Sequence, residues 1–241
     1  MISLVRTEIR KLNGSLALLL AVVAPAFPAL LVTLSVATTD KSSQWASIFN
    51  SFMLPLWALF LMPMIVAAFT TLLAQIEYQA RGWDHLLSLP IPQWQVFLAK
   101  AVVVVIALVG MTLLALIFTW AGAWLGGAIG NHPPTGAIPF ERLAVVSAFL
   151  LAGALLFVAL QTWVAFRFSS FVVSLSFGIG GTMVALAVAM TGTTKADWFP
   201  WVLPMKILTV PDPSRIALVG GLGGLVVLIV MIIDLSRRSF R

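Results

Sequence analysis

The stretch AVVVVIALVGMTLLALIFTWAGAW runs from Ala101 to Trp124 without one charged residue. A helix needs about 20 consecutive, mostly apolar residues to cross the hydrocarbon core of a bilayer. Lys100 directly precedes the stretch, and Trp120 and Trp124 lie near its other end, as is typical of residues at a membrane–water interface. The stretch therefore predicts a transmembrane helix.

The rest of the chain repeats this composition. Hydrophobic residues make up 61% of the 241 residues and charged residues only 9%, whereas a soluble domain carries about 25% charged residues. We therefore expect one all-α domain over residues 1–241, a polytopic membrane bundle of about six transmembrane helices. The five further spans are expected at Leu16–Ala37, Phe52–Ala74, Leu143–Phe166, Phe171–Thr191 and Ile216–Ile233.

Prolines and glycines interrupt several of these spans. Pro25 and Pro28 lie in the first span, and Pro55 and Pro63 lie in the second. Neighbouring helices in a bundle can satisfy the carbonyl groups that a proline frees, so these prolines predict kinks. The glycine run over residues 220–224 predicts close helix packing in the last span.

The basic residues indicate an orientation. Cytoplasmic segments of membrane proteins are enriched in Lys and Arg, and a chain with six spans has both termini on one side. With both termini in the cytoplasm, that side carries nine of the 14 basic residues: Arg6, Arg10, Lys11, Arg81, Lys100, Arg167, Arg237, Arg238 and Arg241. We therefore expect a multi-pass protein with cytoplasmic N- and C-termini.

Residues 1–14 precede the first span and carry a helical pattern. Ile2, Val5, Ile9 and Leu12 share one face of a helix, and basic residues occupy another. This pattern predicts an amphipathic helix lying in the cytoplasmic interface. The alternative is a basic tail that only sets the topology.

Residues 75–100 form the longest cytoplasmic connection. Glu77 and Arg81 are four residues apart in the order that favours an ion pair on a helix. Leu86 and Leu87 then give an apolar patch, and Pro90 ends the helix. We expect a short amphipathic helix that protrudes from the bundle and can dock on another protein.

This connection resembles the corresponding segment of ABC type-2 transporter permease subunits. In that family a Glu, a Gly or small residue, a Leu-Leu-x-Leu-Pro run and a Lys at the start of the third span follow one another. Here they are Glu77, Gly82, Leu86-Leu87-Ser88-Leu89-Pro90 and Lys100. The resemblance implies a coupling helix, with this set of coupling residues: Glu77, Arg81, Gly82, Trp83, Leu86, Leu87 and Pro90.

The same resemblance implies partners and a cargo. The partners would be two copies of an ABC ATPase subunit, which bind ATP and Mg, and a second copy of this permease or a homologous one. Trp83 after Gly82 resembles the lantibiotic-immunity branch, which implies export of an amphipathic antimicrobial peptide from a bacterial cytoplasmic (inner) membrane. Drugs, lipids and glycans are the alternative cargoes.

Residues 192–215 are expected on the outside of the membrane. They are rich in Pro and Trp, including Trp198 and Trp201. The segment should fold back into the outer interface. It would then act as an exit lid, or it would be a loop whose tryptophans belong to the interfacial belt.

The spans themselves offer few polar groups. Gln161 either lines a transport pathway or joins two helices through hydrogen bonds. No span carries a buried ionisable residue by these boundaries, which disfavours an ion-coupled transporter.

The chain has no Cys, no catalytic triad and no metal-binding motif, so we expect neither an enzyme nor a metal or cofactor site in this chain. The basic residues flank lipid-facing runs, so lipid is an expected partner and nucleic acid is not. A non-transporting membrane scaffold for a cytosolic protein remains the alternative function.

Overall fold

The computed structural model describes residues 1–79 and 91–237. Within these ranges the chain is a bundle of helices, and six of them are long and apolar enough to cross a membrane. The all-α fold is thereby confirmed. The six spans are Leu16–Ala37, Trp45–Gln79, Gln93–Gly130, Phe140–Arg167, Phe171–Thr191 and Ser214–Ser236.

The expected N-terminal helix is present as α1 (Ile2–Leu12). The first span consists of α2 (Leu16–Val23) and α3 (Ala26–Ala37), which meet at Pro25 as the proline pattern predicts. The remaining long helices are α8 (Gln93–Gly130), α9 (Phe140–Arg167), α10 (Phe171–Thr191) and α12 (Ser214–Ser236).

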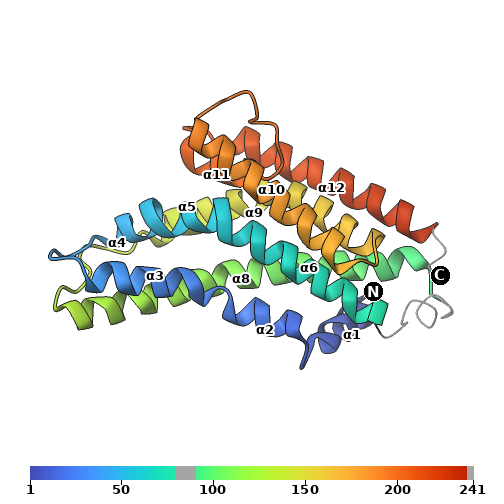
Figure 1. The fold of residues 1–241 in the computed structure, drawn as a ribbon, viewed down its shortest axis with the longest axis horizontal. Helices are drawn as coiled ribbons and strands as arrows, with labels where there is room; N and C mark the ends of the chain where they lie inside the picture. The colour runs from blue at the N-terminus through green and yellow to red at the C-terminus, as the bar shows by residue number, and fades with distance from the viewer. Residues whose placement is uncertain (80–90, 238–241) are drawn as a thin grey trace.

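The long helices lie side by side along the long axis of the molecule (Figure 1). The helix α1 lies at the end of the bundle where α6 (Met62–Gln79) ends, and we call this end the α1 end. At the opposite end, which we call the far end, α3 stops and the second span begins. Two helix pairs, α3 with α8 and α9 with α12, make the most extensive contacts.

Glycines allow both pairs to pack closely. Gly122, Gly126 and Gly130 recur every four residues along α8, and a Cβ atom at Gly126 would lie 2.5 Å from the carbonyl oxygen of Thr33 on α3. On α12, a Cβ at Gly220 would lie 2.4 Å from the carbonyl oxygen of Gly153 on α9. Small residues at such spacing let helix backbones approach in lipid, so the expected packing role of the glycine run is confirmed.

The second span is the most buried of the six. It begins with α4 (Trp45–Ser47), continues through two π-helical stretches, η1 (Ile48–Met53) and η2 (Trp57–Leu61), and ends in α6 (Met62–Gln79). The short α5 (Leu54–Leu56), which contains Pro55, separates the two π stretches. A proline removes a backbone donor, and wide π turns rearrange the hydrogen bonds around it.

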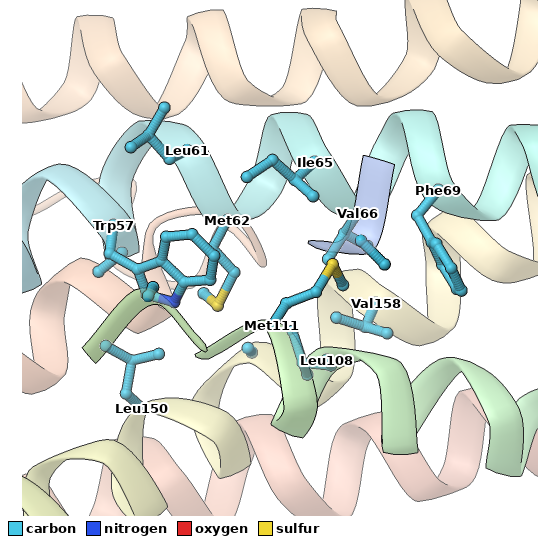
Figure 2. Packing of buried hydrophobic residues seen from close by; sticks show 14 of the residues in the cluster. Trp57, Leu61, Met62, Ile65, Val66, Phe69, Leu108, Met111, Leu150 and Val158 are labelled. Atoms are coloured by element: carbon cyan, nitrogen blue, oxygen red, sulfur yellow. The ribbon is translucent and has the colours of Figure 1, made fainter. Parts of the chain in front are cut away.

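The hydrophobic core forms around this span. Trp57 is fully buried, and its indole N–H donates a hydrogen bond to Thr112 Oγ1 on α8 at 3.3 Å. Figure 2 shows side chains of η2 and α6 packed against α8 and α9; among them are Met62, Val66, Leu108, Met111 and Val158. The second span therefore lies at the centre of the buried core, while the α3–α8 and α9–α12 pairs make the most extensive helix contacts.

The segment between α10 and α12 also enters the bundle. It contains the short helix α11 (Leu203–Thr209), which packs against α9 and η2 at the far end. Trp201 is buried and its ring lies beside Phe157 and Phe177, whereas Trp198 is exposed. Trp201 is thus a packing residue of the core rather than a member of an interfacial belt.

Candidate functional site

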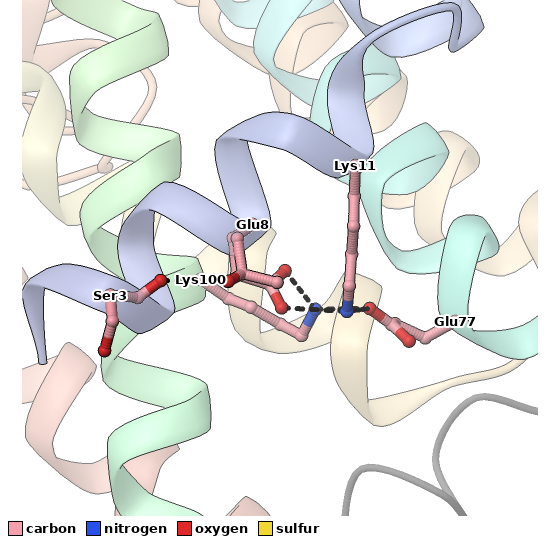
Figure 3. A network of polar contacts seen from close by, with 6 residues as sticks. Ser3, Glu8, Lys11, Glu77 and Lys100 are labelled. Carbon is pink, nitrogen blue, oxygen red and sulfur yellow. Dashed lines mark hydrogen bonds and ion pairs between the residues drawn. The ribbon is translucent and has the colours of Figure 1, made fainter.

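Four charged side chains meet at the α1 end of the bundle (Figure 3). Lys100 Nζ on α8 donates to Glu8 Oε2 at 2.6 Å and to Glu77 Oε1 at 2.8 Å. Lys11 Nζ donates to the same Glu77 oxygen at 2.7 Å and to Glu8 Oε1 at 3.0 Å. We call Glu8, Lys11, Glu77 and Lys100 the charge cluster.

The charge cluster is largely removed from solvent. The Lys100 side chain is 1% exposed, and the side chains of Glu77 and Glu8 are 5% and 6% exposed. Two carboxylates and two ammonium groups balance each other, and each carboxylate accepts hydrogen bonds from both lysines. Buried charges persist only when they are paired in this way, because an unpaired ion loses its hydration without compensation.

The three helices that supply these side chains follow from local sequence. On α1, Glu8 and Lys11 are three residues apart and so face the same side. Glu77 lies in the last turn of α6, which ends at Gln79, and Lys100 lies near the start of α8, which begins at Gln93. The charge cluster therefore joins the two helices on either side of residues 80–92 and attaches α1 to both.

Lys11 is the most exposed member of the cluster, with 28% of its side chain accessible. Burial by itself lowers the pKa of Lys11, but its hydrogen bond to Glu77 and the charge of Glu8 raise the pKa by more. The net effect is a pKa above the ordinary value of 10.5, so Lys11 stays charged at neutral pH.

Two further contacts fix the end of α6. Tyr78 donates its hydroxyl proton to the carbonyl oxygen of Phe166 at 2.7 Å, and Gln75 Nε2 donates to the carbonyl oxygen of Ser169 at 3.0 Å. Both acceptors lie where α9 gives way to α10. The last turn of α6 is thus attached to α1, α8, and the connection between α9 and α10.

The predicted coupling residues divide into two groups. Glu77 lies in the charge cluster and pairs with Lys11 and Lys100. The other six lie outside the described residues: Arg81, Gly82, Trp83, Leu86, Leu87 and Pro90. The predicted coupling helix and the predicted pair of Glu77 with Arg81 therefore also lie outside the described residues.

By the predicted bounds no span carries a charged residue, and Glu77 and Lys100 lie just beyond the bounds predicted for the second and third spans. Glu77 and Lys100 both lie in helices that qualify as spans, and both are buried. The helices α6 and α8 continue beyond the apolar runs that define spans in the sequence, and the Glu77–Lys100 pair lies in these extensions.

Sequence reasoning missed Glu8 and Lys11, although one signal was present. Glu8 is three residues after Val5 and four before Leu12, so it lies on the apolar face of α1. An acidic residue on an apolar face predicts a buried partner of opposite charge. The identity of that partner, Lys100, required the fold.

Gln161 lies elsewhere, in the middle of the bundle. Its side chain is buried, and Nε2 donates to the carbonyl oxygen of Ser174 on α10 at 3.0 Å. Gly178 leaves room for it, because a Cβ there would lie 2.8 Å from Gln161 Oε1. Gln161 therefore joins α9 to α10. Its other predicted role, lining a transport pathway, stays a prediction.

Comparison with known proteins places the chain in a family. Residues 4–185, well over half of the chain, match the family described as ABC-2 family transporter protein. None of the curated proteins compared and none of the solved structures compared matches the chain. The match covers most of α1, both helices that meet at the charge cluster, four complete spans and most of the fifth. The chain belongs to the ABC-2 family of transporter proteins, as a multi-pass, non-catalytic permease subunit.

Proposed function

We propose that this chain is the permease subunit of an ATP-driven ABC exporter, and that the charge cluster passes movement of residues 80–92 to the bundle. The observation that carries the proposal is the position of Glu77 and Lys100. They bracket this segment in sequence and bond to each other across it at 2.8 Å. Family membership supports the rest, because ABC-2 permeases generally work with an ABC ATPase.

The ATPase would dock on the segment between α6 and α8. In this proposal ATP and Mg bind to two copies of the ATPase, and a second permease, identical or homologous, completes the complex. Leu86 and Leu87 seat in a groove of the ATPase, and Gly82, Trp83 and Pro90 shape the segment that presents them. Arg81 contributes positive charge to the same contact.

Movement at the segment would travel along α6. This helix is unbroken from Met62 to Gln79, and it is held at its end by the charge cluster and by Tyr78. It then meets η2, where the helix is π-wound and packs against α11 at the far end. A stiff helix that ends in irregular turns can convert a push at one end into bending at the other.

The cargo we propose is apolar or amphipathic, such as an antimicrobial peptide of the lantibiotic type. Support comes from where the charges lie: the buried acidic and basic groups of the described residues gather at the α1 end, and the buried side chains in the middle of the bundle are uncharged and mostly apolar. A drug, lipid or glycan is the second candidate. The membrane would be the bacterial cytoplasmic (inner) membrane, with both termini in the cytoplasm.

The test is co-purification of the chain in mild detergent from its native membrane, with identification of the partner and an assay for ATP hydrolysis. We expect an ATPase to co-purify with the wild type and to be lost from Leu86→Asp/Leu87→Asp. Ser88→Asp, which places one charge in the same segment without removing a leucine, is the matched control and should keep the partner.

Loss of the ATPase from all variants equally would argue that the leucines do not form the contact. If a folded wild-type chain brings down no nucleotide-binding protein at all, the exporter proposal fails, and a membrane scaffold becomes the better account.

A further inference from the structure

A small cavity opens between the first two spans at the far end of the bundle. It has a volume of about 210 Å³ and lies between α3 and η1. Four of the eight residues that line it are serines: Ser35 on α3, Ser43 before α4, and Ser47 and Ser51 on the second span. Ser47 and Ser51 are four residues apart and so share a face of the helix.

The hydroxyl groups of these serines have no hydrogen-bond partner among the residues that the structure describes. Threonines in the spans behave differently. Thr33, Thr70 and Thr112 each donate to the carbonyl oxygen four residues earlier, at 2.8–2.9 Å. Such back-bonding is how a hydroxyl is satisfied inside a membrane helix.

Free hydroxyl groups would be unfavourable against lipid. Ser51 is six residues beyond Trp45, which places it at most about 9 Å deeper along the helix at 1.5 Å per residue. A polar group that loses water without gaining a hydrogen bond is unfavourable. Ser35, Ser47 and Ser51 are exposed in the structure, so this cluster of hydroxyl groups indicates a surface that meets water or a polar ligand rather than lipid.

The other half of the lining is apolar. Val32, Val36, Ile48 and Phe52 complete the lining of the cavity. No charged residue is among the eight. The cavity thus offers neutral hydrogen-bonding groups beside an apolar wall, which matches an uncharged polar group attached to an apolar body.

We propose that this cavity is a water-accessible subsite that binds the hydroxyl or amide groups of an amphipathic molecule through Ser35, Ser43, Ser47 and Ser51. Its volume accommodates one polar group of a larger molecule rather than a whole ligand. Its use on the exit path of a cargo rests on the proposed exporter function, whereas ligand binding at the cavity does not.

The chain has no cysteine, so single-cysteine variants report one position each. The first experiment labels Ser35→Cys, Ser47→Cys and Ser51→Cys with a charged, membrane-impermeant methanethiosulfonate in right-side-out vesicles. Leu34→Cys is the matched control, because Leu34 is 56% exposed and adjoins Ser35 but does not line the cavity. Labelling after denaturation in SDS verifies that every thiol is present.

Water access decides the expected rates. A thiol reacts as its thiolate, which lipid disfavours, so the three cavity thiols should react about tenfold faster than the Leu34→Cys thiol, or more. Equal rates at all four positions would overturn the proposal. So would oxidative cross-linking of Ser47→Cys into a dimer in place of labelling, because a second copy would then cover this face.

The second experiment tests the ligand class with two probes of equal chain length. Octyl glucoside, used below its critical micellar concentration, carries hydroxyl groups and no charge. Octyltrimethylammonium carries a positive charge and no hydroxyl group. At about twice its dissociation constant, octyl glucoside should slow labelling of Ser47→Cys and Ser51→Cys about threefold, and octyltrimethylammonium should not. Protection by both probes or by neither would overturn the assignment. Neither experiment requires the ATPase, so selective protection without a co-purifying ATPase would refute the exporter and leave the subsite standing.

Discussion

Lys100 on α8 bonds to Glu77 on α6 at 2.8 Å, with the whole connection between the second and third spans lying between them in sequence. The same lysine bonds to Glu8 on α1 at 2.6 Å. One buried ammonium group therefore holds together three helices that are separate in the chain. This relationship makes Lys100 the most sensitive position of the charge cluster.

Replacing Lys100 should destabilise the protein strongly. Lys100→Met would leave two carboxylates buried with only the partly exposed Lys11 to balance them. Breaking a buried ion pair by removing one partner costs about 3–5 kcal/mol. Thermal unfolding in detergent measures the loss. Lys206→Met, which removes a more exposed pair with Asp197 at the far end, is the control and should cost about 1 kcal/mol or less. Similar losses for both variants would contradict the assignment of Lys100.

A second change should restore much of that stability. In Glu8→Leu/Lys100→Leu one acid and one base are removed together, and the Lys11–Glu77 pair at 2.7 Å remains neutral as a unit. Replacing a buried ion pair with apolar residues is often close to neutral in free energy. The double variant should therefore unfold at a higher temperature than Lys100→Leu alone. Additive losses in a double-mutant cycle would show that the two residues are not coupled.

The glycine contact between α9 and α12 can be tested with neighbouring residues. Gly220→Ala would place a methyl group 2.4 Å from the carbonyl oxygen of Gly153, so one backbone must shift, at about 1–3 kcal/mol. At Gly221 the nearest atom is 3.9 Å away, and Gly221→Ala should be neutral or slightly stabilising through helix propensity. Unfolding temperatures of the two variants should differ clearly; indistinguishable values would contradict the close contact.

The pKa of Lys11 predicts how the attachment of α1 depends on pH. Because the pKa in the folded state lies above the ordinary value of 10.5, the contribution of Lys11 is complete below that value and is lost as the pH rises through the folded-state pKa. A spin label at Thr7→Cys on α1 should keep constant mobility from about pH 6 to pH 9 and become mobile only at strongly alkaline pH. An increase in mobility within the neutral range would contradict this assignment.

The sequence predicts the membrane bundle well because apolar length alone identifies spans. The first and fifth spans have the predicted bounds, Leu16–Ala37 and Phe171–Thr191. The second and third are longer than predicted at both ends, because the helices continue beyond the apolar runs, and Glu77 and Lys100 form a buried pair in these extensions. Sequence shows which residues are charged but not that two distant charges meet.

The candidate site was predictable only in part for the same reason. Family resemblance identified Glu77, but its partner Lys11 is 66 residues away in the chain. Trp201 gave a misleading signal, because an aromatic residue beside prolines is typical of an interfacial belt and its burial depends on space left by Gly181 on α10. Both features depend on the packing of helices that are distant in sequence.

The most direct test of the central claim is whether nucleotide at the ATPase changes the far end of the bundle through the charge cluster. The measurement is the rate at which an impermeant thiol reagent labels Ser51→Cys in vesicles that contain the complex, with and without internal ATP, Mg and vanadate. It is made in the wild-type background and in Glu8→Leu/Lys100→Leu. We predict a change of about fivefold or more on nucleotide binding in the wild-type background, and little change in the variant, which should still retain the ATPase. An equal nucleotide response in both backgrounds, or no response in either, would contradict the account.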